Sequence, residues 1–224
     1  MKNLRIAIIG NIGVGKSTLI EALEKSPLKE ILLSMCNSYE LEKNLYVFPE
    51  EFDPKVLDAF YKDPVKHAFT AQIEFLNARL KRQSKIQKVS GIVLEDRTIY
   101  EDFHIFGKAQ KMLKHLSEQE YGVYQRTYEL MLDKINKPNI LVYLQADTPT
   151  LMNRIAKRGR DSEKSIEKEY IDYLNTLYES FIKSHAPCPI LMIDAKENDN
   201  MDQYLLGICG KIKDKVSELH RAVT

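Results

Sequence analysis

The sequence predicts a three-layer α/β fold, in which a small parallel sheet of about five strands is surrounded by helices. Short apolar segments alternate along the chain with longer segments of helical periodicity, as in repeated strand–helix–strand units. The strand segments are apolar on both faces, which is typical of parallel strands buried from both sides. We expect residues 1–224 to form a single domain, because the chain fills one core and contains no linker, repeat or low-complexity segment.

Five segments are predicted to be strands. Each is short and apolar, and each is bounded by glycine, proline or charged residues. These segments are residues 4–9, 45–48, 91–94, 140–144 and 189–193.

Helices are predicted between these strands from apolar spacing and from signals at the first turn. Asp53-Pro54 and Asp63-Pro64 each place an N-cap residue before a proline, which favours a helix start. The predicted helices are residues 17–25, a helix from residue 54, then 64–88, 98–113, 117–135, 148–157, 167–183 and 201–221. Residues 26–44 show no clear pattern.

The composition restricts the classes of partner. A net charge of +1 gives no reason to expect a nucleic acid or an acidic membrane surface. No apolar run approaches the length of a membrane span, and residues 6–9 are too short for a signal core. The widely spaced Cys36, Cys188 and Cys209 indicate reduced thiols. We expect a cytoplasmic protein, with a matrix location of a processed form as the alternative.

A glycine-rich loop follows the first predicted strand. Residues 10–17 read GNIGVGKS and fit GxxxxGK[ST] at every fixed position, between a strand and a helix. Such a loop turns backbone N–H groups around phosphate oxygens, and the helix N-terminus adds positive potential. In this P-loop the lysine reaches the β- and γ-phosphates and the hydroxyl reaches Mg²⁺. The predicted ATP-binding residues are Gly10, Asn11, Ile12, Gly13, Val14, Gly15, Lys16, Ser17 and Thr18.

A cluster of arginines indicates a small kinase rather than a GTPase or a motor. Residues 136–139 read NKPN and lack the aspartate of a guanine-reading motif, and 224 residues leave little room for a motor. Arg154 and Arg158 lie four apart on one helix face, and Arg160 follows. Small kinases close such a lid, here about residues 158–164, on the transferring phosphoryl group. A solvated basic helix end is the alternative.

The order of several motifs resembles the deoxyribonucleoside kinase family, in its deoxycytidine, deoxyguanosine and deoxyadenosine kinase branch. The resemblance covers nearly the whole chain. It rests on GNIGVGKST, on Phe69-Thr70-Ala71-Gln72 with Arg79, on Leu94-Glu95-Asp96-Arg97-Thr98 with Tyr100 and Asp102, and on Arg154, Arg158-Gly159-Arg160 and Glu163. It implies a P-loop kinase fold and ATP-dependent, Mg²⁺-assisted transfer of the γ-phosphate to a deoxynucleoside 5′-hydroxyl. It also implies a homodimer or an oligomer of related subunits.

The resemblance implies that Gln72 bonds the nucleobase, while Arg79 and Asp102 shape the far end of its pocket. Gln72 and Arg79 are seven residues apart and share a helix face, and a glutamine amide both donates and accepts. The presence of both Arg79 and Asp102 resembles the purine and cytosine branch, with adenine, guanine and cytosine left open. Phe69 and Phe75 flank Gln72 and either wall in a base or belong to the core, and the core is favoured for Phe69.

The resemblance also implies a site for the sugar. Tyr61 lies eleven residues before Gln72, where the family has the tyrosine that bonds the 3′-hydroxyl. Glu163, beside Arg160, matches that tyrosine's partner. The alternatives are that Tyr61 is an ordinary half-buried aromatic residue and that Glu163 is a solvated surface acid. We predict that Tyr61, Arg160 and Glu163 contact the substrate.

The remaining predicted residues concern the reaction. Phosphoryl transfer needs a carboxylate near the attacking hydroxyl and charge stabilisation at the phosphoryl group. Glu50 aligns with the family's catalytic glutamate, but Glu51 stands where the family has proline and is the alternative base. Asp96-Arg97 ends a buried strand, at the sheet edge where ligands bind. We therefore expect Asp96 to share Mg²⁺ with Ser17, and Arg97 to orient the catalytic carboxylate. The lid residues Arg154 and Arg158 are predicted to serve both ATP binding and catalysis.

Two other functions share part of this pattern. A deoxynucleoside monophosphate kinase of the thymidylate-kinase type also has a P-loop, an Asp-Arg segment and an arginine lid, and it needs further basic residues for the acceptor's phosphate. A nucleotide-binding subunit without catalysis is the second alternative, against which the acidic and basic residues of the predicted site argue.

Overall fold

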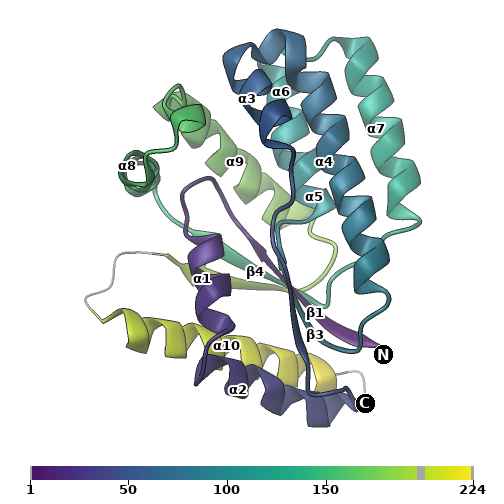
Figure 1. Ribbon diagram of the computed structural model, residues 1–224, viewed down its shortest axis with the longest axis vertical. Helices are drawn as coiled ribbons and strands as arrows, with labels where there is room; N and C mark the ends of the chain where they lie inside the picture. The colour runs from purple at the N-terminus through teal and green to yellow at the C-terminus, as the bar shows by residue number, and fades with distance from the viewer. Residues whose placement is uncertain (1, 196–199, 223–224) are drawn as a thin grey trace.

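The computed structural model describes residues 2–195 and 200–222 and contains a five-stranded parallel sheet (Figure 1). The strand order is β2-β3-β1-β4-β5, and every neighbouring pair is parallel. The strands are β1 (Asn3–Ile9), β2 (Leu45–Phe48), β3 (Gly91–Asp96), β4 (Ile140–Gln145) and β5 (Ile190–Asp194). This sheet confirms the predicted fold class.

Helices cover both faces of the sheet. The elements on one side are α1 (Lys16–Leu23), α2 (Leu28–Leu33), η1 (Ser34–Tyr39) and α10 (Met201–Arg221). The elements above the other face and around the cleft are α3 (Pro54–Lys62), α4 (Pro64–Ile86), α5 (Ile99–Glu101), η2 (Asp102–Gly107), α6 (Lys108–Met112), α7 (Glu118–Leu132), α8 (Thr148–Arg158), η3 (Asp161–Glu163) and α9 (Lys168–Ser184). Figure 1 shows α2 and α10 below the sheet, and α4, α7 and α9 above it.

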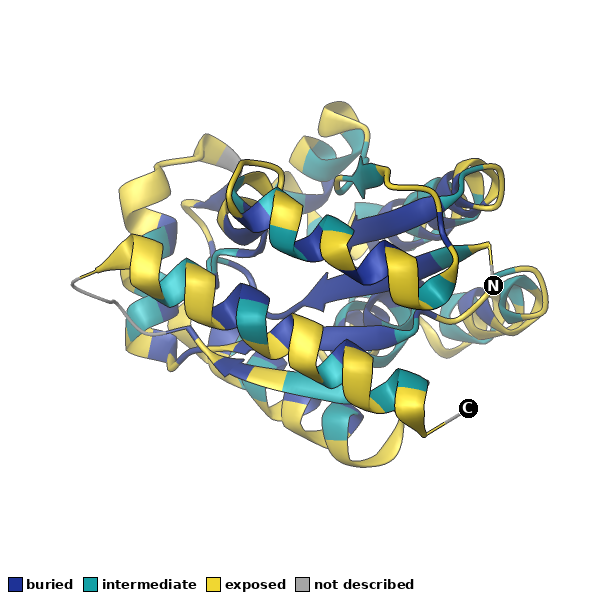
Figure 2. Cartoon of the chain, turned by 90° about the horizontal axis from the view of Figure 1, so that it is seen from below, coloured by how far each residue is buried: buried dark blue, intermediate teal, exposed yellow. Residues whose placement is uncertain are grey.

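The central strands are buried from both sides, as a parallel sheet requires (Figure 2). All six residues of β3 are buried, and β1 is buried from Leu4 onward. β3 ends in two buried acids, Glu95 and Asp96, and Glu95 is paired with an arginine of the neighbouring strand. Arg5 of β1 donates to both carboxylate oxygens of Glu95, at 2.7 and 3.0 Å. The two charges therefore compensate each other inside the core.

Two regions differ from the sequence prediction. Residues 26–44, which show no clear pattern, form α2 and η1, and both pack against α10. The helix predicted over residues 98–113 is present from Ile99 to Met112, but its middle part, η2, is π-helical and joins α5 to α6. Gly107 ends this turn, where an added Cβ atom would overlap the ring of Tyr124. The wider turn carries Asp102 and Phe106 to the cavity described below.

Local helix signals are confirmed where the structure describes them. The Asp53 carboxylate accepts a hydrogen bond from the backbone N–H of Lys55 at 2.8 Å, and Asp63 accepts from Lys66 at 3.2 Å. Cys36, Cys188 and Cys209 all lie in the described part of the chain and are unpaired. Within the described ranges, the structure has no helix with the length and apolarity that a membrane crossing demands.

Candidate active site

The carboxyl ends of β1, β2 and β3 open into one cavity. In parallel α/β sheets, ligands bind at this edge, where strand connections leave in opposite directions. Here the chain runs from the central strand β1 to the edge strand β2 and then returns to β3 between them. The cavity has a volume of about 860 Å³ and extends from the P-loop to α4.

The P-loop lines one wall of this cavity. Residues 12–19 contribute, and α1 begins at Lys16. Gly13 has a φ of +80°, and a Cβ atom there would overlap Ile155, so the loop needs glycine at this position. Two of the predicted nucleotide-binding residues, Gly10 and Asn11, do not line the cavity. The Asn11 amide instead donates to the carbonyl of Ile171 at 3.1 Å, which fastens the loop to α9.

Lys16 is buried and has no acidic partner within ion-pair distance among the described residues. Its ammonium donates to the carbonyl oxygens of Gly10 at 2.8 Å and Asn11 at 3.1 Å. Burial, together with the nearby cation of Arg97, lowers the Lys16 pKa to about 8. With only carbonyl partners, the Lys16 ammonium is available to bind a phosphate group at the P-loop.

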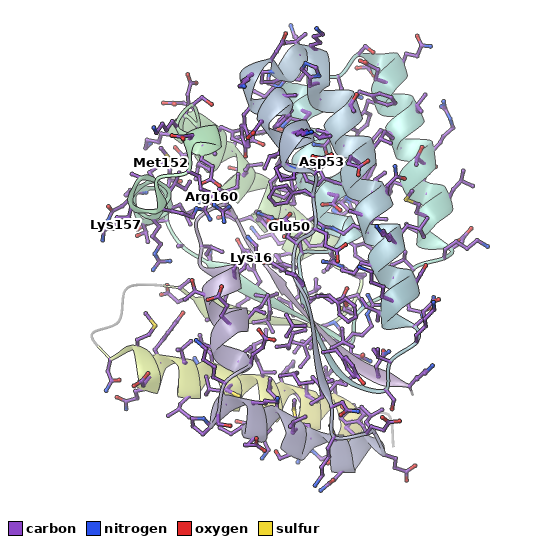
Figure 3. The ribbon with its side chains drawn as sticks, viewed as in Figure 1. Lys16, Glu50, Asp53, Met152, Lys157 and Arg160 are labelled. Carbon is purple, nitrogen blue, oxygen red and sulfur yellow. The ribbon has the colours of Figure 1, made fainter. Side chains whose placement is uncertain are left out.

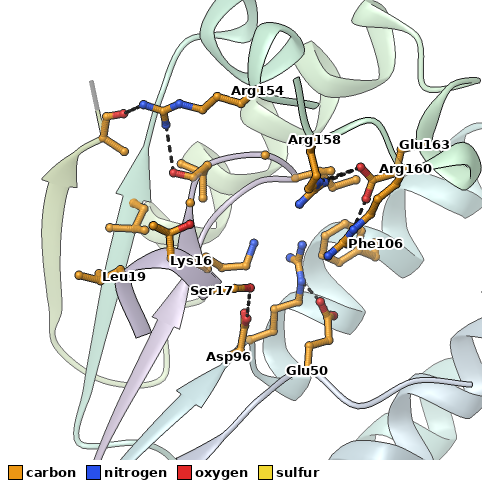
Figure 4. A pocket seen from close by; sticks show the side chains of 18 of the residues that line it. Lys16, Ser17, Leu19, Glu50, Asp96, Phe106, Arg154, Arg158, Arg160 and Glu163 are labelled. Carbon is orange, nitrogen blue, oxygen red and sulfur yellow. Dashed lines mark hydrogen bonds and ion pairs between the residues drawn. The ribbon is translucent and has the colours of Figure 1, made fainter. Parts of the chain in front are cut away.

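Ser17 and Asp96 meet on the floor of the cavity (Figure 4). The Ser17 hydroxyl donates to Oδ2 of Asp96 at 3.0 Å. The second carboxylate oxygen, Oδ1, is buried and has no hydrogen-bond partner among the described residues. Hydroxyl and carboxylate oxygens suit Mg²⁺, which takes its other ligands from phosphates and water. The pair therefore fits the predicted metal position, although no cluster of three potential ligands from His, Cys, Asp and Glu exists in the described residues.

Glu50, rather than Glu51, presents its carboxylate to the cavity. Oε1 of Glu50 lies 3.0 Å from Nε of Arg97 and 3.2 Å from Nη2 of Arg79. Burial would raise the Glu50 pKa, but Arg97, Arg79 and Lys16 outweigh it and lower the pKa to about 2. Glu51 points elsewhere, and its half-exposed carboxylate pairs with Lys85 at 2.9 Å. Glu50 is therefore ionised at neutral pH and faces the cavity.

Arg97 is held from several sides. Its Nη1 atom donates to the Tyr178 hydroxyl at 3.1 Å and lies 3.5 Å from Oε1 of Glu101, which is fully buried. The guanidinium also lies over the Phe106 ring, 4.5 Å from its centre. The backbone of Arg97 is left-handed, with a φ of +63°. Sequence reasoning missed Glu101 and Tyr178, because neither belongs to a motif with a defined spacing.

The acceptor end of the cavity is formed by α4 and η2. Gln72 is buried, and its Oε1 accepts from the Tyr124 hydroxyl at 3.4 Å. Arg79 binds both oxygens of Asp102, at 2.9 and 3.1 Å. Gln72, Phe75 and Asp102 line the cavity, whereas Arg79 lies behind Asp102.

Phe69 is not brought to the cavity. Its ring packs into two apolar clusters, one around Phe60 and the other around Leu76 and Tyr124. It is absent from the lining of the cavity, so its ring belongs to the apolar packing between the helices. Of the two alternatives for Phe69, this packing agrees with the core and not with contact to the base.

Tyr61 and the lid close the side of the cavity. Burial, with the negative charge of Glu163, raises the Tyr61 pKa to about 12, so the phenol keeps its proton and can donate it. Glu163 is buried, and it accepts from Arg158 at 2.6 Å and from Arg160 at 3.4 Å (Figure 4). Arg160, like Lys16 and Glu50, lies around the centre of the molecule between the sheet and the upper helices (Figure 3).

Arg154 anchors the lid to the P-loop. Its guanidinium donates to the carbonyl oxygens of Val14 at 3.1 Å and Ala195 at 2.7 Å. Arg154, Arg158 and Arg160 all line the cavity, so the structure brings the predicted lid to the P-loop.

Several lining residues were not predicted. On the acceptor side they are Phe52, Leu57, Phe60, Phe106, Gln110 and Tyr170, and on the P-loop side they include Met201, Tyr204, Leu205 and Ile208. The apolar residues 201, 205 and 208 follow helical spacing, which without a structure is indistinguishable from a core-facing stripe.

Comparison with known proteins points to one family. The model of the family described as "Deoxynucleoside kinase" matches residues 6–217. A deoxyadenosine/deoxycytidine kinase of Bacillus subtilis is 33% identical over 200 residues, which cover 88% of this chain and 85% of that protein. A deoxyadenosine kinase of Dictyostelium discoideum is 31% identical, covering 88% of this chain and 74% of the relative.

Solved structures agree. A deoxyadenosine kinase from M. mycoides with bound products dCMP and a flexible dCDP superposes with a TM-score of 0.76 and 28% identity, covering 94% of this chain and 100% of that one. The structure of deoxyadenosine kinase from M. mycoides with bound dATP gives a TM-score of 0.72 and 30% identity, covering 93% and 98%.

Proposed function

The chain belongs to the deoxynucleoside kinase family, and on this premise we propose that it transfers the γ-phosphate of ATP to the 5′-hydroxyl of a deoxynucleoside. Its substrates are deoxyadenosine, deoxyguanosine or deoxycytidine, the nucleosides named in the relatives. One observation carries the proposal. The P-loop, the Glu50 carboxylate and the Gln72 amide, from three separate parts of the chain, all line one cavity.

The triphosphate would lie along the P-loop. Lys16 supplies a buried cation for the β- and γ-phosphates, and the start of α1 supplies backbone N–H groups. Ser17 and Asp96 would hold Mg²⁺, which when bound neutralises charge on the phosphate oxygens. Arg158 of the lid completes the charge stabilisation around the phosphoryl group.

The deoxynucleoside would occupy the opposite end. Gln72 has both a donor and an acceptor for the base edge, and the Arg79–Asp102 pair presents carboxylate oxygens beyond it. Tyr61 and Glu163, which both line the cavity, would bind the 3′-hydroxyl. This leaves the 5′-hydroxyl between Glu50 and the P-loop.

Glu50 would orient the 5′-hydroxyl and receive its proton. A carboxylate with a pKa of about 2 is a weak base but a reliable hydrogen-bond acceptor at neutral pH. That suits a loose phosphoryl transition state, in which most of the bond to the leaving group breaks before the nucleophile must lose its proton. Arg97 fixes the carboxylate at 3.0 Å and extends toward the same space.

The monophosphate-kinase alternative needs free cations for the acceptor's phosphate. Of the arginines near the acceptor end, Arg79 is bound to Asp102 and Glu50, and Arg97 is bound to Glu50. The non-catalytic alternative is opposed by the presence of Glu50, Asp96 and Arg97 together in the cavity.

The direct test incubates the purified protein with ATP, Mg²⁺ and one nucleoside at a time. The panel contains deoxyadenosine, deoxyguanosine, deoxycytidine, thymidine, their ribonucleoside counterparts and the deoxynucleoside monophosphates. We expect 5′-monophosphates from at least one of the first three, with thymidine and the monophosphates turned over at least tenfold more slowly. Faster turnover of a monophosphate supports the alternative kinase, and no product from any deoxynucleoside contradicts the proposal.

The protonation of Lys16 should make kcat/KM for ATP depend on pH. Because its pKa is lowered to about 8, mainly by burial, the ammonium that attracts phosphate is progressively lost above that pH. We expect kcat/KM for ATP to be level from pH 7 downward to about pH 6.5 and to fall about tenfold per pH unit above pH 8. The variant Lys16→Arg keeps its charge at these pH values and should lack the alkaline fall, although its activity is lower. An unchanged alkaline limb in this variant would assign the limb to another group.

We propose in addition that the chain is a cytoplasmic homodimer. Val65 of α4, Met112 of α6 and Val123 and Leu130 of α7 are exposed apolar side chains on the helical layer of the acceptor side. Sedimentation velocity over a range of concentrations measures the oligomeric state.

A further inference from the structure

Arg82 is a buried arginine to which the mechanism above gives no role. It lies on α4, three residues beyond Arg79, and only 3% of the residue is exposed. It does not line the active-site cavity. Its guanidinium contacts the backbone at the end of β3 and just after β2, next to Glu50, Asp96 and Arg97.

The hydrogen bonds of Arg82 go to backbone carbonyls of the site. Nη1 donates to the carbonyl of Asp96 at 2.8 Å and, at 3.4 Å, to that of Pro49, the residue before Glu50. Nη2 donates to the carbonyl of Arg97 at 2.5 Å. One planar guanidinium thus joins the ends of two strands at the three places where the reactive side chains leave the sheet.

The carbonyl of Arg97 requires such a partner. Arg97 has a φ of +63°, a conformation that is uncommon for residues other than glycine and that persists only where its surroundings enforce it. On one side, the backbone N–H of Arg97 donates to the carbonyl of Ile8. On the other side, Arg82 binds its carbonyl. The two bonds hold the peptide groups that flank the Arg97 side chain, which contacts Glu50.

Neutralising a buried acid does not account for Arg82. The nearest acid is Glu95, whose Oε2 is 3.8 Å from Nη2 of Arg82. Glu95 already has two shorter bonds to Arg5. Burial, with the repulsion of Arg79, lowers the Arg82 pKa to about 10, so its charge is only partly compensated. The contacts of Arg82 with the carbonyls of Asp96 and Arg97, at 2.8 and 2.5 Å, are shorter than its 3.8 Å contact with Glu95.

We propose that Arg82 is a positioning residue for the phosphoryl transfer. By binding the carbonyls of Pro49, Asp96 and Arg97, it fixes the position of the Glu50 and Arg97 side chains relative to each other. This inference rests on the proposed kinase activity. Arg82 would contact neither substrate, but it would set the geometry of Glu50 and Arg97, which face the substrates. An error of about 1 Å in such groups lowers turnover by about a hundredfold.

The test compares Arg82→Met and Arg82→Lys with Lys85→Met, a matched change on the same helix at a half-exposed side chain that pairs with Glu51. We expect Arg82→Met to lower kcat by about a hundredfold while KM for ATP and for the deoxynucleoside stays within about threefold. Arg82→Lys can reach only one or two of the carbonyls, so we expect a loss of about tenfold. Lys85→Met should stay within about twofold of wild type.

A crystal structure of Arg82→Met tests the geometry separately from turnover. We expect a changed Arg97 backbone and a Glu50–Arg97 contact lengthened by about 1 Å or more, in a protein that remains folded. A kcat near that of wild type, or a loss of activity that only follows the folded fraction in thermal unfolding, overturns the proposal. So does an unchanged site in the crystal. Wild-type protein in the same assay reports on the proposed function itself, and an inactive wild type with a displaced Arg97 in the variant would refute the function but not the positioning.

Discussion

The variant Glu50→Gln is expected to lower kcat by about a thousandfold, the range of a lost general base. Glutamine keeps the size of the side chain but removes the negative charge that Arg97 and Arg79 contact at 3.0 and 3.2 Å. It can no longer receive the proton of the 5′-hydroxyl. KM for ATP should change little, because the P-loop is built by other residues. Steady-state kinetics with saturating ATP measure the effect.

Glu51→Gln is the matched control for this prediction. It makes the same chemical change one residue further along, at a carboxylate that pairs with Lys85 at the surface. We expect its kcat to remain within about twofold of wild type. If Glu51→Gln lost activity and Glu50→Gln did not, the assignment of the catalytic carboxylate would be wrong.

The second large effect is expected at Arg158. The variant Arg158→Ala should lower kcat by about a thousandfold, because an arginine that stabilises the transferring phosphoryl group contributes a factor of that order. Its side chain is 35% exposed and bonds within the lid to Glu163, so folding should change little. Thermal unfolding and kcat, measured on the same preparation, separate the two effects.

Lys157→Ala provides the comparison. It removes a neighbouring cation on the same helix, where the side chain is exposed and absent from the lining of the cavity (Figure 3). Near-normal turnover is expected from this variant. Equal losses at both positions would mean that the overall charge of the helix end matters, rather than one guanidinium in the lid.

The sheet and the P-loop could be predicted because their signals are local. β1 is apolar on both faces from Ile6 to Ile9, and GxxxxGK[ST] fixes the turn that follows it. Helix starts at Asp53 and Asp63 depend on neighbours two or three residues away. In contrast, α2 and η1 owe their stability to packing against α10, which is distant in the sequence and leaves no local pattern.

The functional residues on the acceptor side could be predicted only from the family resemblance. Glu50 and Glu51 are adjacent acids, and only the fold shows that one faces Arg97 and the other Lys85. Phe69 and Phe75 are both aromatic residues on α4, but only Phe75 reaches the cavity.

The residues that support the site were beyond sequence reasoning altogether. Glu101, Tyr178 and Arg82 act through contacts between elements far apart in the chain. A buried charge within an amphipathic helix looks like a surface residue until its partners are known.

In the proposed complex, one cavity places a deoxynucleoside 5′-oxygen between Glu50 and the P-loop-bound triphosphate. A crystal structure with deoxyadenosine and a non-hydrolysable ATP analogue measures this directly. We expect the 5′-oxygen within about 2.6–3.2 Å of a Glu50 carboxylate oxygen, with the base edge against Gln72. A deoxynucleoside bound with its 5′-oxygen away from Glu50, or outside the cavity that Lys16 lines, would contradict the account.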